Sequence, residues 1–268
     1  MNIISSSQND KVKYLNKLYR SRNRRKEGVF ILEGKRLIEA ALAGGADFRQ
    51  VFLTPAFFKS AENEDLLADL KLKAEFIYIE ESLLKETAST VNPQGILAVV
   101  KESVFKGEDF YQQADKILLL DRIQDPGNMG TMIRTAVAAG FDSIIALKGS
   151  VDIYNQKVIR ATMGGIFSIA IRQKISQDDF LSEIKNKAAD YELLAADTRA
   201  KEYHFEHQYQ DKLILMIGNE ANGLDSDLLE TATSKIKIPL AGEIESLNAA
   251  VAASVISFEI LSQQMKKD

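Results

Sequence analysis

The chain has 268 residues, of which 46% are hydrophobic and 27% are charged, a composition typical of one large or two modest globular domains. It contains no Cys, which excludes disulfides, thiolate metal sites and cysteine nucleophiles and fits a reducing compartment. The formal net charge of −4 averages an uneven distribution, because residues 1–36 carry +7 and the remainder carries −11.

The N-terminal residues lack the basic and apolar segments of a secretion signal, and no later stretch is apolar enough to span a bilayer. We therefore expect a cytoplasmic protein. The basic segment 1–36 is open to two interpretations. It forms either a solvated helix face or a surface that neutralises nucleic-acid phosphates.

After a helix in the basic segment, the first block of the chain alternates short apolar runs with amphipathic stretches. We expect its strands at Val29–Glu33, Gln50–Leu53, Phe76–Ile79 and Ile96–Val100. Helical spacing predicts helices at Lys35–Ala43, Ala56–Leu70 and Glu81–Ala88. The mixed-charge segment 101–113 then places a domain boundary between residues 107 and 108.

The second block repeats this alternation with more apolar strands. Its expected strands are Lys116–Leu120, Ser143–Leu147, Ile166–Ile171, Glu192–Ala196, Leu213–Ile217 and Lys235–Ile238. Its expected helices are Met129–Ala139, Asn155–Met163, Asp178–Ala189, Asp225–Ala232 and a buried helix within Leu247–Leu261. The pattern predicts an α/β fold with a mostly parallel sheet, whose ligand crevice lies in the loops after Leu120, Ala196, Ile217 and Ile238.

The loop after the first of these strands carries glycines beside Asn128 and opens a helix with a single charge, Arg134. Glycines there allow a ligand to approach the backbone closely. The loop has neither the dinucleotide-binding Gly pattern nor the Gly-Lys-Ser/Thr of a triphosphate loop, so both of those sites are excluded. Arg134 either pairs with the core or, as we favour, faces an anionic substrate.

Two further loops near the C-terminus carry polar residues among glycines. Glu220 follows a buried strand and is bracketed by Gly218 and Gly223, although such loops are also common turns. Ser246 is a plausible helix N-cap. Asn248 then falls just inside an Ala-rich helix that disfavours it, so we expect its amide to be hydrogen-bonded.

The two His residues and the absence of Cys limit other chemistry. His204 and His207 could supply two metal ligands, but a third would have to be a carboxylate, so we expect no metal and a polar surface loop instead. Methylation of a pyrimidine C5 position by way of a thiolate adduct is excluded, because the chain has no Cys.

Together, the three loops resemble the three motifs of the SpoU (TrmH-type) RNA ribose 2′-O-methyltransferases of the SPOUT superfamily. Asn128 with Gly130 and Arg134 is similar to the first motif, and Gly218-Asn-Glu-x-x-Gly223 to the second. Ile238-Pro-Leu-x-Gly with Ser246-Leu-Asn248 is similar to the third, and the resemblance covers residues 115–265. Upstream, Phe30-Ile-Leu-Glu-Gly34 is similar to the small RNA-binding domain that precedes many members. The third motif departs from the family at Ala250, where many members have Ser.

The resemblance implies a substrate RNA-binding domain at 1–107 and a SPOUT domain at 108–268, with a C-terminal trefoil knot, homodimerisation and S-adenosylmethionine (AdoMet) as cofactor. The implied catalytic residues are Arg134, Asn128, Glu220, Ser246 and Asn248. The implied cofactor-binding residues are Gly218, Ile238, Leu247, Asn219 and Leu240. The candidates for RNA contact are Lys11, Lys13, Arg22, Arg24, Arg25, Lys35 and Arg36.

The function that the resemblance implies is AdoMet-dependent 2′-O-ribose methylation of 23S-type ribosomal RNA. Because Arg stays protonated in proteins, we expect Arg134 to bind a target phosphate and stabilise the developing alkoxide, while Asn128 orients the ribose or Arg134. Three alternatives stay open at this point: a tRNA 2′-O-methyltransferase, a non-catalytic RNA-binding SPOUT protein, and a base N-methyltransferase of another SPOUT branch.

Overall fold

A computed structural model describes residues 2–102 and 110–267 of the chain. The chain divides into two compact units, Met1–Ser103 with Tyr154–Phe167 and Val104–Ile153 with Ser168–Asp268, and only their described residues are considered below. The predicted domain boundary at 107–108 lies outside the described residues. No described helix is long and apolar enough to cross a membrane.

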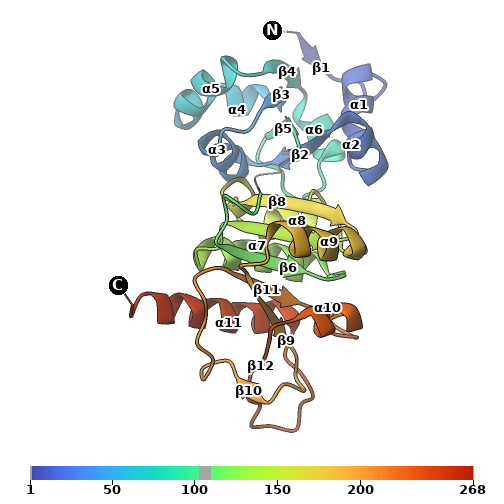
Figure 1. Cartoon of the computed structure of the whole chain (residues 1–268). Coiled ribbons are helices and arrows are strands. Elements are labelled where there is room, and N and C mark those ends of the chain that lie inside the picture. Colours follow the sequence, from blue (N-terminus) through green and yellow to red (C-terminus); the bar gives the residue numbers. More distant parts are fainter. Residues whose placement is uncertain (1, 103–109, 268) are drawn as a thin grey trace. The chain divides into compact units, whose positions relative to one another are not determined.

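The first unit is built on a mixed five-stranded sheet in the order β1-β4-β3-β5-β2, labelled in Figure 1. Its strands are β1 (Ile3–Ile4), β2 (Val29–Glu33), β3 (Phe48–Leu53), β4 (Glu75–Ile79) and β5 (Ile96–Lys101). Its helices are α1 (Asp10–Leu18), α2 (Ser21–Glu27), α3 (Lys35–Ala43), α4 (Pro55–Lys59), η1 (Ala61–Asn63), α5 (Glu64–Lys71), α6 (Glu81–Thr87), α8 (Gln156–Ala161) and η2 (Gly165–Phe167). The strands β3 and β4 pair in parallel, whereas β5 runs antiparallel to both β2 and β3.

The segment Tyr154–Phe167 packs on the first unit although it is distant in sequence. The ring of Tyr154 stacks on Phe30, with centroids 4.4 Å apart, and Gln156 Nε2 donates to the carbonyl of Ile31 at 2.9 Å. The sequence analysis predicted a strand at Ile166–Ile171, but its predicted first residue is wrong, because β8 begins at Ala170. The chain turns at Gly164, whose φ is 93°, so a strand forms only from Ala170 onward.

The second unit is built on a seven-stranded sheet in the order β10-β12-β9-β11-β6-β7-β8, in which every pairing is parallel. Its strands are β6 (Lys116–Leu120), β7 (Ser143–Leu147), β8 (Ala170–Ile175), β9 (Glu192–Ala196), β10 (Glu202–Tyr203), β11 (Leu213–Ile217) and β12 (Ser234–Lys237). Its helices are α7 (Pro126–Ala138), α9 (Gln177–Lys187), α10 (Ser226–Thr231) and α11 (Ala249–Gln264). The predicted α/β class with a parallel sheet is confirmed.

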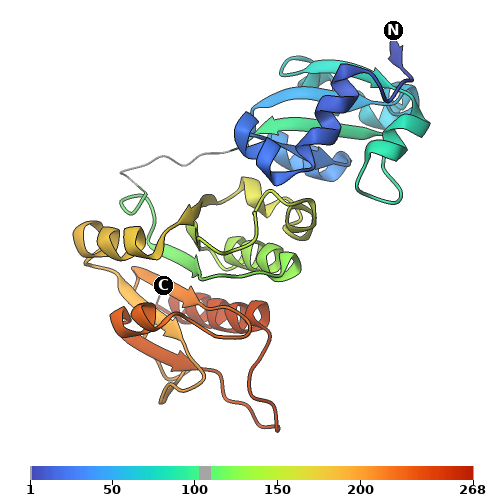
Figure 2. The ribbon, with the colours of Figure 1, turned by 90° about the vertical axis from the view of Figure 1, so that its right-hand side faces the viewer.

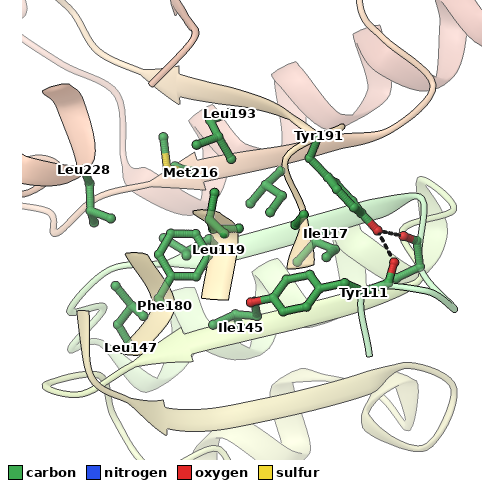
Figure 3. Close-up of a cluster of buried hydrophobic side chains, with 14 of the residues drawn as sticks. Tyr111, Ile117, Leu119, Ile145, Leu147, Phe180, Tyr191, Leu193, Met216 and Leu228 are labelled. Carbon is green, nitrogen blue, oxygen red and sulfur yellow. Dashed lines mark hydrogen bonds between the residues drawn. The ribbon is translucent and has the colours of Figure 1, made fainter. Parts of the chain in front are cut away.

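Helices cover both faces of this sheet, which explains why its inner strands β6, β7, β9 and β11 are almost entirely buried. In Figure 2, α9 and α10 (gold and orange) lie on one side of the sheet, and α7 and α11 (green and red) lie on the other. Figure 3 shows the first of these faces, where Phe180 of α9 packs among Leu119 and Leu147. The hydroxyl of Tyr191 donates to the carbonyls of Tyr111, at 2.6 Å, and Ala114.

One predicted helix is divided. In place of a continuous helix at Ala56–Leu70, the chain forms α4, η1 and α5. Thr54 caps α4 by accepting from the amide of Phe57 at 3.2 Å, and the side chain of Asn63 donates to the Phe57 carbonyl at 2.9 Å. Thr54 thus begins α4, whereas Asn63 binds the Phe57 carbonyl in place of a helical amide, and α4 ends after little more than one turn.

Candidate functional site

A cavity of about 360 Å³ lies where β9, β11 and β12 end at their carboxyl termini. The loops after these three strands line it, and Ala249, Ala252 and Ile256 of α11 close it on another side. The crevice therefore lies at three of the four loops that the sequence singled out. Its size is in the range of small-molecule and cofactor sites.

All five predicted cofactor residues line this cavity, namely Gly218, Asn219, Ile238, Leu240 and Leu247. Of the predicted catalytic residues, Glu220 and Ser246 also line it, whereas Asn128, Asn248 and Arg134 are not part of its wall. The structure therefore brings together the second and third sequence motifs around one concave surface.

The second motif folds as a tight hairpin at the cavity wall. The backbones of Asn219 and Gly223 exchange hydrogen bonds of 3.0 and 2.9 Å, and the Asn219 side-chain oxygen accepts from the amides of Ala221 and Asn222. A Cβ atom at Gly218 would collide with the backbone of Gly223 and the next residue, so only glycine fits there. The hairpin holds Glu220 at its exposed tip.

The first motif begins α7 with two local devices. Asp125 is the N-cap, and its carboxylate accepts from the Asn128 amide at 2.8 Å, while Pro126 occupies the first helical position. The backbone of Asn128 is thereby fixed. Its side chain is directed toward the second motif, where Nδ2 donates to Glu220 Oε1 at 2.9 Å.

Asn248 is the N-cap of α11, which corrects the expectation that Ser246 caps this helix and that Asn248 lies inside it. Its Oδ1 accepts from the amides of Ala250 and Val251, at 2.9 and 3.3 Å, and its Nδ2 donates to Asn128 Oδ1 at 2.9 Å. The expected hydrogen bonds of this amide are confirmed. Ala250, the departure from the family motif, is buried and takes part through its backbone.

The hydrogen bonds among Asn248, Asn128 and Glu220 run in one direction. The cap occupies Asn248 Oδ1, so its NH₂ group faces Asn128, and Asn128 must then accept with its oxygen and donate with its nitrogen. The chain of amides ends at the carboxylate of Glu220, which can only accept when it is ionised. Three residues from three sequence motifs therefore form one polar unit.

Asp121 and Arg122, just before the first motif, brace this unit. Asp121 is 1% exposed, and its carboxylate accepts from Arg122 Nε and Nη2 at 2.9 and 2.8 Å and from the amide of Asp225 at 3.0 Å. The hydrogen bonds to Asp121 raise the pKa of Arg122. The carbonyl of Arg122, whose φ is 55°, accepts from Asn219 Nδ2 at 2.9 Å. The sequence analysis did not single out either residue. The signal that could have found them is an Asp directly after a buried strand, where a charged side chain needs partners.

Arg134 lies on the exposed face of α7, and neither an ion pair nor a hydrogen bond joins it to another residue in the described part of the chain. The side chain of Asn128 is hydrogen-bonded to Glu220 and Asn248 and not to Arg134. The expectation that Arg134 avoids the core is consistent with this exposure. Its guanidinium is available to a phosphate or to a second subunit.

The seven candidates for RNA contact have different surroundings in the first unit. The side chains of four are exposed, namely Lys13, Arg22, Arg25 and Arg36. Lys11 forms an ion pair with Glu75. Lys35 Nζ donates to the carbonyl of Glu62 at 2.6 Å.

Arg24 differs from the other six because it is only 3% exposed. Its Nη1 donates to the carbonyls of Leu18 and Tyr19, at 3.0 and 2.8 Å, which lie at the end of α1. This arginine therefore joins α1 to α2, and its guanidinium does not face the surface.

The His pair does not form the polar surface loop that was predicted, because His207 is only 8% exposed. Its Nε2 lies 2.6 Å from Glu192 Oε1 and its Nδ1 lies 3.1 Å from Glu202 Oε2. Among the described residues, no cluster of His, Asp and Glu is arranged to hold a metal ion. His207 instead joins β9 to the segment around β10.

Two family models match the chain over ranges that correspond to these features. The model of the SpoU rRNA Methylase family matches residues 115–258, and the model of the MRM3-like substrate binding domain matches residues 9–98. A curated relative from Synechocystis, an uncharacterized tRNA/rRNA methyltransferase, is 34% identical over 97% of this chain and 94% of its own length. The Bacillus subtilis 23S rRNA (guanosine(2553)-2′-O)-methyltransferase RlmP is 32% identical over 97% of this chain and 99% of its own length.

Solved structures show the same fold over nearly the whole chain. The SpoU methyltransferase AviRb from Streptomyces viridochromogenes, in complex with the cofactor AdoMet, is 26% identical with a TM-score of 0.88 over 96% of this chain and 99% of its own. The AdoMet-bound rRNA methyltransferase from Sinorhizobium meliloti is 28% identical with a TM-score of 0.87 over 96% of both chains. The family model covers more than half of the chain and the relatives nearly all of it, so the chain belongs to the SpoU rRNA methylase family.

Proposed function

We propose that this protein transfers a methyl group from AdoMet to a ribose 2′-oxygen of ribosomal RNA. One observation carries the proposal: the directed hydrogen bonds from Asn248 through Asn128 to Glu220 end at the rim of the cavity that fits a cofactor. The methyltransferase names of the relatives and the AdoMet complexes among the solved structures support it.

The cavity suits AdoMet for reasons of shape. Gly218 lets the hairpin of the second motif close at the cavity wall, and Ile238, Leu240 and Leu247 add apolar side chains to the lining. We assign the cofactor to these residues and to Asn219. When bound, the cofactor supplies an electrophilic methyl group on a sulfonium, and the protein has to position the attacking hydroxyl.

The polar unit is placed to bind that hydroxyl. Asn128 occupies Glu220 Oε1, whereas Oε2 has only a 3.4 Å hydrogen bond from Asn219, and Glu220 is an exposed residue. We assign Oε2 as the acceptor for the ribose 2′-hydroxyl, and Ser246 to the same rim. Arg134 binds a neighbouring phosphate and stabilises negative charge on the attacking oxygen.

We further propose that the chain dimerises through α7 and α11. The α11 helix is mostly apolar, and it exposes Val251, Val255 and Phe258, which are 48%, 36% and 48% exposed and lie about one turn apart. A helix of this composition is normally covered on every side. Because Arg134 lies on the outer face of the adjacent helix α7, a dimer would bring it close to the partner subunit.

The C-terminal trefoil knot is part of the same proposal. The segment between β12 and α11 has to cross the ends of β9 and β11, because β12 pairs with β9 while α11 packs against α7 beside β6. This segment and the loops after β9 and β11 line the same cavity, so they lie close together. Threading of this segment through those loops would give the knot.

The first unit would bind parts of the substrate RNA other than the nucleotide that is methylated. Its match to a substrate-binding domain and the exposed Lys13, Arg22, Arg25 and Arg36 support this assignment. We omit Arg24 from this surface because its guanidinium is buried against backbone carbonyls. A cytoplasmic location stays a prediction.

The test is to map 2′-O-methylation across total RNA from cells with and without the gene. One ribosomal RNA nucleotide should lose resistance to base-catalysed cleavage when the gene is deleted, and the purified protein with AdoMet should restore it. A methyl group that appears in tRNA or on a base would replace this proposal with one of the alternatives. RNA binding without any methyl transfer would indicate a non-catalytic protein.

A further inference from the structure

An exposed aromatic turn follows β10 in the second unit. The rings of Tyr203 and Phe205 are nearly parallel, with 18° between their planes and 5.5 Å between their centroids, and Phe205 is 50% exposed. Lys237 Nζ lies 5.1 Å from the centroid of the Tyr203 ring. The turn therefore presents a flat aromatic surface with a cation at its side.

Hydrogen bonds attach this turn to the edge of the sheet. The amide of His204 donates to the carbonyl of Lys237 at 2.9 Å, and the hydroxyl of Tyr209 donates to the carbonyl of His204 at 2.5 Å. His207, held between Glu192 and Glu202, fixes the end of the turn.

Each of the two acidic residues of the turn has a partner within the second unit. Glu202 is the ion-pair partner of His207, and Glu206 Oε2 accepts from the amide of Tyr203 at 3.1 Å. The cations are less constrained, because Lys201 is exposed and Lys237 is the one beside the aromatic pair. A ligand that stacks on Phe205 could therefore pair an anionic group with Lys237.

The turn adjoins the cofactor cavity. Lys237 lines the cavity and lies over Tyr203, and β10 pairs directly with β12, which carries Lys237 (Figure 1). A strand of RNA whose ribose reaches the cavity rim would pass close to this turn. Bases of single-stranded RNA stack on aromatic side chains, and their phosphates pair with nearby lysines.

We propose that Tyr203 and Phe205 form a stacking platform for an unpaired base of the substrate RNA, next to the nucleotide that is methylated. The platform rests on the proposed RNA methyl transfer and adds a binding site for the base. Phe205 supplies the exposed stacking face, Tyr203 supports it from behind, and Lys237 neutralises a phosphate. With this platform, the second unit would itself bind single-stranded RNA.

The experiment compares Phe205→Leu, which stays apolar but cannot stack, with Phe205→Trp, which stacks. The probe is a single-stranded RNA 12-mer of mixed sequence, with binding followed by fluorescence anisotropy. A 2-aminopurine base in the same oligomer reports stacking by loss of its fluorescence. Leu72→Ala, which alters an 88% exposed apolar side chain of the first unit, is the control.

We expect Phe205→Leu to weaken binding about tenfold and to abolish the 2-aminopurine quenching, while Phe205→Trp keeps both. AdoMet binding and elution volume in gel filtration should not change in any variant. Equal binding by the wild type and Phe205→Leu would overturn the platform, and so would a change of oligomeric state in Phe205→Leu. Methyl transfer to an unmodified 23S rRNA transcript, measured on the wild type, tests the proposed function separately.

Discussion

The side-chain amide of Asn248 both caps α11 and donates to Asn128 Oδ1 at 2.9 Å, so one residue starts a helix and orients the polar unit of the site. Asp is as good an N-cap as Asn, but it has no NH₂ group to donate. The two roles can therefore be separated by substitution.

We predict that Asn248→Asp keeps the thermal stability of the wild type but lowers the methyl-transfer rate at least tenfold. Asn248→Ala should lose the rate and also about 1 kcal/mol of stability, because the cap is gone. Thermal unfolding and single-turnover methylation of ribosomal RNA measure the two effects. An active Asn248→Asp variant would show that the donor from Asn248 to Asn128 is dispensable.

The isolated guanidinium of Arg134 leads to a second prediction. Arg134→Ala should fold normally and bind AdoMet as the wild type does, because neither the cavity wall nor a hydrogen bond involves this side chain. Its methyl transfer should be lost. Calorimetric titration with AdoMet and a methylation assay check both halves, with Lys187→Ala on the exposed face of α9 as the control. Near-normal turnover would remove Arg134 from the mechanism.

Much of the second unit could be predicted from sequence because its strands are buried on both faces. The continuous apolar runs Lys116–Leu120, Ser143–Leu147, Glu192–Ala196 and Leu213–Ile217 have the same bounds in the sequence analysis and in the structure. Such runs contain no Gly or Pro and are too short for a helical period, so a strand is the favoured prediction. The two-residue strands β1 and β10 were missed because they are too short to show a period.

The site was only partly predictable, because its key contacts join distant segments. Ser246 and Asn248 are both good N-caps by type, and the contact of Asn248 with Asn128, 120 positions away, is not encoded locally. Arg24 and Arg25 are equivalent in a charge count, yet only Arg24 is buried against α1. Residue type thus indicates which side chains are capable of a role, whereas the chain path decides which of them meet.

The left-handed backbone of Arg122 gives a third prediction, which concerns stability. A side chain with a Cβ atom is strained at a φ of 55°, whereas glycine is not. Arg122→Gly and Arg122→Ala both lose the ion pair with Asp121, so we expect the Gly variant to be more stable by about 1 kcal/mol. Chemical denaturation of the two variants measures this difference. Equal stabilities would mean that the loop relaxes and that the conformation is not imposed by its surroundings.

The apolar outer face of α11 gives a fourth prediction. If α11 lies in a dimer interface, Phe258→Glu should place an uncompensated charge there and produce a monomer. Light scattering coupled to gel filtration measures the mass, and Phe205→Glu, a substitution of a similarly exposed ring outside α11, is the control. A wild type that is monomeric at micromolar concentration would contradict the dimer, whatever the variant does.

The ion pair of Arg172 with Glu183 makes part of the stability dependent on pH. The hydrogen bonds from Arg172 Nη1 and Nη2, at 2.7 and 2.8 Å, lower the pKa of Glu183 below its ordinary value of 4.5. Because the folded-state pKa is the lower one, the contribution of Glu183 is fully present above about pH 4.5 and disappears as the pH falls through the lowered value. Glu183→Gln should therefore be less stable than the wild type at pH 7, and the two proteins should converge as the pH falls through the lowered pKa of Glu183. Urea unfolding across this range measures the gap, and a gap that stays constant with pH would show that Glu183 contributes by packing alone.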